Sequence, residues 1–399
     1  MWDAVIRYLL LVRMAWTVGL GGAALLAVTT LGAPARPDVH LSALVIGASS
    51  TNPGGDGVAD FYGGLFGQDP TVVANFLTGP PGIYRAIADN QDGTTVVLSS
   101  GWGAANASAL LSYLQVTHDP TLADPTVFVL DNNVARPNGG FGTRYPVFAL
   151  IGVNPVPAPV DPGVAVLDVG YEYDINGDTP AYVLNPVAMA NSLATYFDNR
   201  LNQAGTALPV HADGSLALSA TECDSVCHDG IDAGEDTTVH LDSGQTVVVK
   251  HVGDTTYVSY RRDGLPLLQP LRTYGGEVGK KIADATEPAL KAVVDYGYPD
   301  NDALAGPDRY APARLVPTPK ETRTFVRQFT AGVRQGAQTL RGDSPVTTAR
   351  ATRHAAAPKR PVAKAVKVAM KRMDSLAKKL RVTNSQKKPA KARAGHGRD

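Results

Sequence analysis

A run of small residues, SSGWG at positions 99–103, stands between the β-branched segment Thr94–Leu98 and a segment with helical spacing, Ala104–Gln115. A strand, a tight turn of small residues and a helix make up a nucleophile elbow, in which a serine occupies the strained apex of a Gly-x-Ser-x-Gly pattern. With small residues two positions before and after it, the apex falls on Gly101. Glycine has no oxygen for nucleophilic attack, so we expect an elbow that lacks its catalytic serine.

Ser100 is the neighbouring hydroxyl that could act in place of the missing serine. A register with Ser100 at the apex would put Leu98 and Trp102 at the two flanking positions. Strand and helix approach closely there, so these bulky side chains argue against that register. Ser100 therefore stays open as the weaker candidate nucleophile.

The elements that must position this turn alternate along the chain. Short apolar or β-branched segments indicate strands, and segments with apolar residues at helical spacing indicate helices. The expected strands are Leu41–Ile46, Thr94–Leu98, Thr126–Leu130 and Val164–Tyr171, and the expected helices include Ala104–Gln115 and Ala188–Leu201. This alternation predicts an α/β fold with a mostly parallel central sheet covered on both faces.

A polar segment at about residues 202–262 is expected to form a lid-like insertion. It ends in two strand-like runs, Gln245–His251 and Thr255–Arg261, which predict a hairpin. It also holds the two cysteines, Cys223 and Cys227, which in an exported chain favour a disulfide. A metal site is the alternative, but no second Cys/His cluster completes one, so we expect none. The acidic run in residues 224–236 lacks the order of a calcium loop and is expected to be solvated.

Both ends of the chain differ in composition from the body. The 22 residues between Arg13 and Arg36 carry no charge, and residues 33–35 read Ala-Pro-Ala, as at a signal-peptidase site. Residues 1–35 are therefore expected to be a cleaved signal peptide or a retained membrane anchor. Either alternative predicts export to the cell envelope or beyond.

The net charge of zero conceals an acidic body and a basic tail. From Arg341 onward the chain has 17 Lys and Arg against 3 Asp and Glu. Residues 301–341 are expected to be an extension, and residues 342–399 a low-complexity, disordered tail with one basic amphipathic helical stretch. Such a stretch can bind anionic lipid or an anionic envelope polymer, or can be a solvated helix without a partner. Nucleic acid is the less favoured partner.

Several motifs in series resemble the PE-PPE domain, a serine-hydrolase domain of mycobacterial secreted and cell-envelope proteins. They occur in the order of that family and extend from Leu41 to Tyr298. They comprise Leu44–Ser50, Arg136–Gly140 with Arg144-Tyr145, Glu172–Pro180, Val252–Tyr257, Leu265–Arg272 and Val293–Tyr298. The resemblance implies a cutinase-like α/β-hydrolase fold over residues 41–300 and esterase activity on acyl esters, without a cofactor.

The resemblance also implies a Ser…Asp…His triad, which this chain matches only in part. The serine position falls on Gly101, in agreement with the elbow pattern. The acid falls in the Glu-Tyr-Asp element, on Asp174 or Asp178, unless these carboxylates cap a turn. No histidine matches, because the stretch where it is expected reads Tyr-Phe-Asp-Asn-Arg at residues 196–200. Four histidines in the right order are not singled out by any motif: His211, His228, His240 and His251.

Two functions from different classes remain open at this point. The first is a non-catalytic relative of the esterases that binds a lipid or a partner in the cell envelope. The second is a weak or altered esterase that uses Ser100 or another nucleophile. Loss of the triad serine removes most of the rate of such enzymes, which favours the first.

Overall fold

The central element of the fold is one sheet of eight strands. The structure is a computed structural model that describes residues 41–67, 70–91, 93–122, 126–209, 237–241, 244–299 and 306–342. Along the sheet the strands follow the order β2 (Thr71–Ala74), β1 (Leu41–Gly47), β3 (Thr94–Ser100), β4 (Thr126–Asp131), β5 (Ala165–Tyr171), β8 (Thr255–Tyr260), β7 (Thr246–Val252) and β6 (Thr237–His240). The first six of these strands run parallel, and β7 and β6 are antiparallel to their neighbours.

The strands of the sheet are apolar on both sides because both faces are covered. In β3, Val97 packs on one face together with helices α3 (Gly79–Ala88) and α4 (Trp102–Thr117). Val96 and Leu98 point to the opposite face, where the segment around α2 (Phe61–Gly64) covers them. Successive side chains of a strand alternate between faces, so a doubly covered strand reads as a continuous apolar run. The expected α/β fold with a mostly parallel sheet is confirmed.

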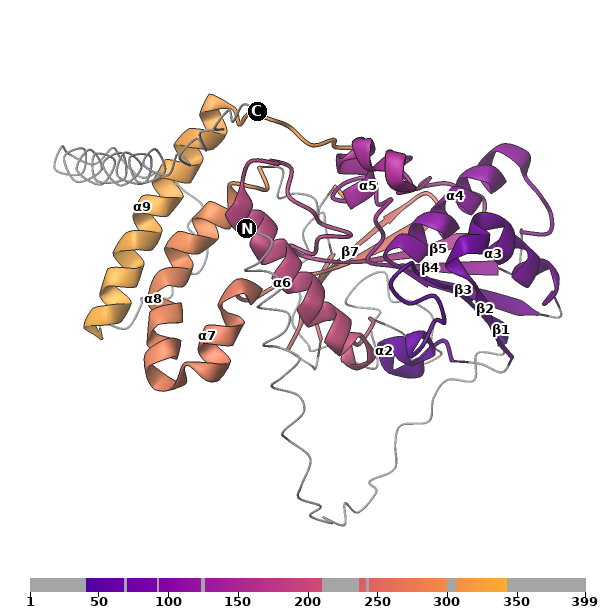
Figure 1. Cartoon of the computed structure of the whole chain (residues 1–399), viewed down its shortest axis with the longest axis horizontal. Helices are drawn as coiled ribbons and strands as arrows, with labels where there is room; N and C mark the ends of the chain where they lie inside the picture. Colours follow the sequence, from indigo (N-terminus) through magenta and orange to yellow (C-terminus); the bar gives the residue numbers. More distant parts are fainter. Residues whose placement is uncertain are drawn as a thin grey trace, which may run out of the picture. The chain divides into compact units, whose positions relative to one another are not determined.

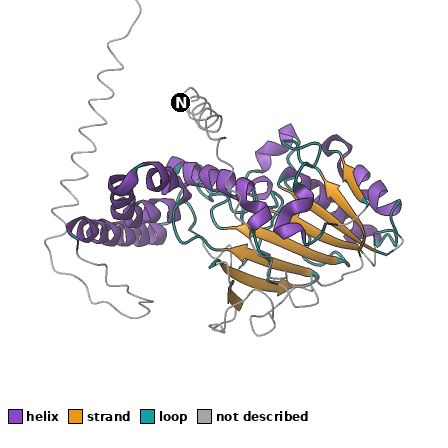
Figure 2. Cartoon of the chain, turned by 90° about the horizontal axis from the view of Figure 1, so that it is seen from below, coloured by secondary structure: helices purple, strands orange, loops and turns teal. Residues whose placement is uncertain are grey.

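Of the remaining helices, α5 (Phe141–Arg144) lies beside α4, and the others gather on the side of the molecule away from α3 and α4 (Figure 1). Figure 2 shows the same arrangement from below. These other helices are α6 (Pro186–Asn202), α7 (Gln269–Tyr274), α8 (Gly276–Asp295) and α9 (Pro319–Arg341), and short 3-10 turns lie at Val58–Asp60, Phe76–Thr78, Pro146–Ile151, Gln203–Gly205 and Pro266–Leu268. Helices α8 and α9 lie side by side because Gly332 and Gly336 of α9 leave room for the α8 backbone at Pro288 and Ala285.

The hairpin expected at residues 245–261 is present as β7 and β8. Its strand β8 pairs in parallel with β5, so this part of the expected insertion belongs to the central sheet. The N-terminal segment 1–35, the acidic run, both cysteines and the tail from residue 343 lie outside the described residues. None of the described helices combines the length and the apolar character that a membrane span requires.

β1 and α4 can cross this closely only because position 103 is a glycine. A Cβ placed there would stand 2.3 Å from the Gly47 carbonyl oxygen and 2.8 Å from that of Ala48. Both obstacles are backbone atoms of a buried strand end, which cannot move aside as a flexible side chain can. The small residue required two positions after the apex of the turn is therefore explained by this close approach.

We predict that Gly103→Ala lowers the free energy of unfolding by about 2 kcal/mol or more, because overpacking forces the helix away from the sheet. The matched control is Gly205→Ala, where an added Cβ meets nothing within 4 Å. This control is expected to change stability by less than about 0.5 kcal/mol. Urea unfolding of both variants measures the difference. Equal stability of the two would contradict the close crossing.

Candidate functional site

The turn between β3 and α4 has the backbone geometry of a strained apex. Gly101 has φ 57° and ψ −115°, in a region that residues with a Cβ rarely adopt. Its N–H donates to the Asp131 carbonyl oxygen at 2.9 Å, and α4 begins directly after it. A Cβ at Gly101 would lie 3.0 Å from the side-chain nitrogen of Asn176. That amide therefore stands over the face of Gly101 from which a longer side chain would project.

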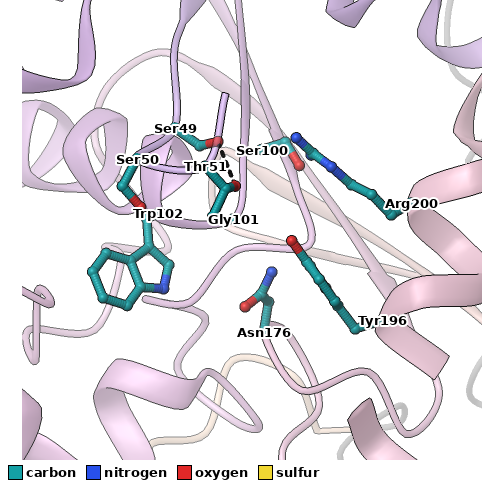
Figure 3. A pocket seen from close by; sticks show the side chains of 9 residues that line it. All are labelled: Ser49, Ser50, Thr51, Ser100, Gly101, Trp102, Asn176, Tyr196 and Arg200. Carbon is teal, nitrogen blue, oxygen red and sulfur yellow. Dashed lines mark hydrogen bonds between the residues drawn. The ribbon is translucent and has the colours of Figure 1, made fainter. Parts of the chain in front are cut away.

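A pocket opens beside this turn, at the carboxyl edge of the parallel strands (Figure 3). It encloses about 300 Å³ of empty space, part of it open to solvent, and is lined by Ser49, Ser50, Thr51, Ser100, Gly101, Trp102, Asn176, Tyr196 and Arg200. The first three follow β1, and the next three comprise the last residue of β3 and the two residues after it. The strand order reverses at these two neighbouring strands, which is where α/β sheets bind their ligands.

Ser100 lines the pocket, but its hydroxyl is engaged below the turn. Its Oγ donates to Oδ2 of Asp131 at 2.7 Å. Asp131 is fully buried and also accepts from Tyr62 OH at 2.5 Å, from Tyr171 OH at 3.2 Å and from the Gln203 amide. Burial raises the pKa of Asp131, against the lowering effect of its hydrogen bonds and of the charge of Arg200. Ser100 thus contacts a carboxylate and no histidine among the described residues.

Asp174, the first acid candidate, lies beneath helix α6 rather than in the pocket. Its Oδ2 accepts from Asn199 Nδ2 at 2.6 Å, and its Oδ1 accepts from the backbone N–H of Asn176 at 2.9 Å. Burial raises the pKa of Asp174 to about 6 despite these hydrogen bonds. The oxygen of the Asn199 amide accepts from Arg262, which is held by Asp198 at 2.5 Å. Asp174 therefore fixes both Asn176 and α6 at the pocket wall.

Asp178, the second acid candidate, has a structural position away from the pocket. Its Oδ2 accepts from the backbone N–H of Tyr173 at 2.8 Å, and its Oδ1 has no hydrogen-bond partner in the part of the chain that the structure describes. Burial raises the pKa of Asp178 to about 7, although this hydrogen bond and the charge of Arg144 lower it. Asp178 closes the turn that carries Asn176, as expected of a capping carboxylate.

Three hydrogen-bond donors line the pocket and are free of partners within the described residues. They are the Arg200 guanidinium, the Tyr196 hydroxyl and the Asn176 side-chain amide. Tyr196 and Arg200 are four residues apart on α6 and share one face of the helix. The three side chains lie around Gly101 and Ser100 from the side opposite Ser49 and Thr51 (Figure 3).

An apolar edge borders these polar groups. Trp102 lines the pocket, and its ring centroid lies 6.5 Å from that of Phe76, in the 3-10 turn after β2. The next residue, Leu77, exposes 91% of its surface. On the α6 side, Phe197 exposes 41% of its surface next to Tyr196. The pocket therefore combines convergent donors with apolar side chains at its mouth, as small-molecule sites commonly do.

The histidines and cysteines do not complete a catalytic or metal site among the described residues. His251 bonds Thr256 Oγ1 at 3.0 Å near the start of β8, at the edge of the sheet opposite the pocket. Cys223, Cys227, His211 and His228 lie outside the described residues, so the disulfide stays a prediction. No three His, Cys, Asp or Glu side chains in the described ranges come together as metal ligands.

The Arg136–Gly140 motif has a structural role. Arg136 is buried, and its Nε lies 3.0 Å from Oδ1 of Asp168 while Nη2 donates to Ser259 Oγ at 2.7 Å. The guanidinium passes over Gly170, where a Cβ would collide with it. The motif therefore links β4, β5 and β8 beneath the site.

Sequence reasoning did not find the residues that give the pocket its character. Asp131 directly follows a buried strand, and a carboxylate at that edge of a parallel sheet is a recognisable signal. Tyr196 and Arg200 lie in the stretch where the family resemblance places a histidine, and their helical spacing puts both on one face of α6. Nothing in the sequence singles out Asn176, because its position depends on the turn that Asp174 and Asp178 hold.

Comparison with known protein families matches residues 215–299 to the PE-PPE domain. This segment of the chain is therefore similar to the PE-PPE domain. In the described residues the matched part of this domain comprises β6, β7, β8, α7, α8 and the turn after α8. The pocket residues precede the matched segment, so the boundaries of the domain at 41–300 stay a prediction.

Curated relatives extend the similarity beyond the matched PE-PPE segment. "Esterase PE16" of Mycobacterium tuberculosis is 29% identical over 243 residues, which are 59% of this chain and 38% of that protein. "Uncharacterized PPE family protein PPE28" of the same organism is 26% identical over 286 residues, which are 64% of this chain and 39% of that protein. The chain thus spans less than two fifths of the length of these relatives. No solved structure matches the chain.

We predict that raising the pH from 5 to 8 destabilises the fold through Asp178. Its folded pKa of about 7 exceeds the ordinary value of 3.8, so the folded state binds more protons between these values. Stability therefore falls as pH rises through this window, by about 1.4 kcal/mol for each unit of pKa difference. Asp178→Asn is expected to remove the part of this loss that Asp178 contributes, while buried Asp174, with its pKa raised to about 6, still contributes in the same window. Urea unfolding at pH 5 and pH 8 measures the difference.

The matched control for this pH dependence is the exposed carboxylate Asp263. Asp263→Asn is expected to leave the slope of stability against pH unchanged. An unchanged slope in Asp178→Asn would show that the buried carboxylate does not hold its proton in the folded state.

Proposed function

We propose that this chain is an exported, non-hydrolytic member of an esterase-like family that binds an acyl ligand in the pocket beside Gly101. The single observation that carries the proposal is the identity of the apex residue. The turn has the strained conformation in which related hydrolases present a serine, and the residue there is glycine.

The surroundings of the apex support the loss of hydrolysis. A serine nucleophile needs an adjacent base that takes its proton, and no histidine among the described residues lines the pocket. The space over Gly101 is held by the Asn176 amide, which Asp174 fixes from below. The described site thus has neither the serine at the apex nor the histidine base that hydrolysis by a triad needs.

Binding of an acyl ligand is supported by the composition of the pocket. Trp102 and Phe76 offer an apolar edge at its mouth, while Arg200, Tyr196 and Asn176 offer donors inside it. A ligand with a polar head and an apolar chain satisfies both parts at once. The similarity to a protein named as an esterase agrees with a ligand that contains an acyl group.

The setting that we propose is the cell envelope. It rests on the apolar N-terminal segment with its Ala-Pro-Ala end, and on the basic segment from Arg341 onward. A basic segment adds about 1 kcal/mol of attraction per Lys or Arg near an anionic surface. We propose that residues 342–399 hold the protein at anionic lipid or polymer.

A weak esterase that uses Ser100 is the alternative function, and one observation favours it. Ser100 Oγ lies at the pocket and bonds the Asp131 carboxylate at 2.7 Å. A carboxylate with a raised pKa can accept a proton from a hydroxyl. Three further donors already occupy that carboxylate, which makes it a poor base.

We predict that a fluorophosphonate probe does not label the purified full chain and that short-chain p-nitrophenyl esters are not turned over above background. Ser100→Ala is expected to behave as the wild type does, because its hydroxyl is held by Asp131. Labelling is measured by in-gel fluorescence. A reactive serine hydrolase in the same experiment serves as the positive control.

The control variant for this experiment is Ser112→Ala, a serine on α4 that bonds only its own helix. Stoichiometric labelling of the wild type and of this control, abolished in Ser100→Ala, would establish the alternative esterase and overturn the non-hydrolytic function.

A further inference from the structure

We infer that the pocket beside Gly101 binds the carboxylate of a free acyl acid, with Arg200 as its counter-ion. This inference rests on the proposed function and narrows the ligand from any acyl compound to the acid itself. It distinguishes the free acid, which bears a negative charge, from its esters, which do not.

The unpaired charge of Arg200 is the first support. The guanidinium lines the pocket and makes no hydrogen bond or ion pair with another described residue. A guanidinium presents a planar fork of donors that matches the two oxygens of a carboxylate. A neutral ester offers this fork one carbonyl oxygen and no charge.

The other donors of the pocket favour the same ligand. Tyr196 OH and the Asn176 amide face the same space and are equally free of partners within the described residues. A carboxylate has about four acceptor positions, so it can accept from all three side chains at once. The hydroxyls of Ser50 and Thr51 line the opposite wall.

None of the nearest described carboxylates forms an ion pair with Arg200. Asp131 accepts from Tyr62, Ser100, Tyr171 and Gln203, and its interaction with Arg200 is electrostatic without an ion-pair contact. Oδ2 of Asp174 accepts from Asn199 instead. Asp198, two positions before Arg200 on α6, pairs with Arg262. The acids around α6 therefore have other partners.

Glycine at the apex completes the arrangement. A carboxylate seated among these donors approaches Gly101, and a serine side chain there would occupy the same space as the ligand and Asn176. The Trp102–Phe76 edge then lies where an acyl chain leaves the pocket. The residue change that removes hydrolysis thus makes room for the acid.

The test is calorimetric titration of the full chain with octanoate, methyl octanoate and octyl phosphate. We expect octanoate to bind at least tenfold more tightly than its methyl ester. Arg200→Gln should weaken octanoate binding by about 10- to 100-fold and leave methyl ester binding unchanged, because hydrogen bonds between charged groups are the strong ones. Arg200→Lys should recover part of the affinity. Arg334→Gln, on α9, is the matched control and should bind as the wild type does.

Three outcomes overturn the inference. If the wild type binds octanoate and its methyl ester equally well, the pocket binds acyl compounds but does not select the acid. This outcome needs only the wild-type chain, so it decides the inference even if Arg200→Gln does not fold. If octyl phosphate binds more tightly than octanoate, the ligand of the pocket carries a phosphate head group and not a carboxylate. Failure of the acid and the ester to bind at all would overturn the proposed function as well.

Discussion

The carboxylate of Asp131 is the interaction on which the site depends. It accepts hydrogen bonds from α2, the end of β3, β5 and the turn after α6. A buried charged or polar group is tolerated only when its hydrogen-bonding capacity is satisfied, so these four donors are held together. Because Ser100 is one of them, its hydroxyl is held by this carboxylate at the pocket wall. Gly101, whose N–H bonds the Asp131 carbonyl, is left at the apex.

The turn at Gly101 keeps its strained conformation although the serine that usually occupies such an apex is absent. The positive φ of Gly101 is imposed by the passage from β3 to α4, whose closeness to β1 requires Gly103. Glycine adopts this conformation without the steric cost that other residues bear. Packing between β1, β3 and α4 therefore determines the backbone conformation of the site, whereas the surrounding side chains determine the chemistry of the site.

Much of this fold could be predicted from the sequence, and the reason is local. The strands around the turn are continuous apolar runs, and the small residues of the turn are required by a contact between neighbouring elements. The site was predictable only in part. Gly101 and Ser100 lie in the turn that motif spacing predicts, whereas Asp174 lies beneath α6 and Asp178 stabilises a turn. Arg200, Tyr196 and Asn176 meet across elements distant in the chain, and the sheet order that joins them cannot be read from spacing.

The position of β8 bears on how this protein can be divided. β8 stands between β5 and β7, so the family-matched segment supplies an internal strand of the sheet instead of an appended module. A fragment that ended before residue 237 would leave the hydrogen-bonding edge of β5 open along its length, and open strand edges recruit other chains. Gene fragments and domain swaps that respect only the matched boundaries would therefore yield two aggregation-prone halves, whereas exchange of residues 41–299 keeps the sheet whole.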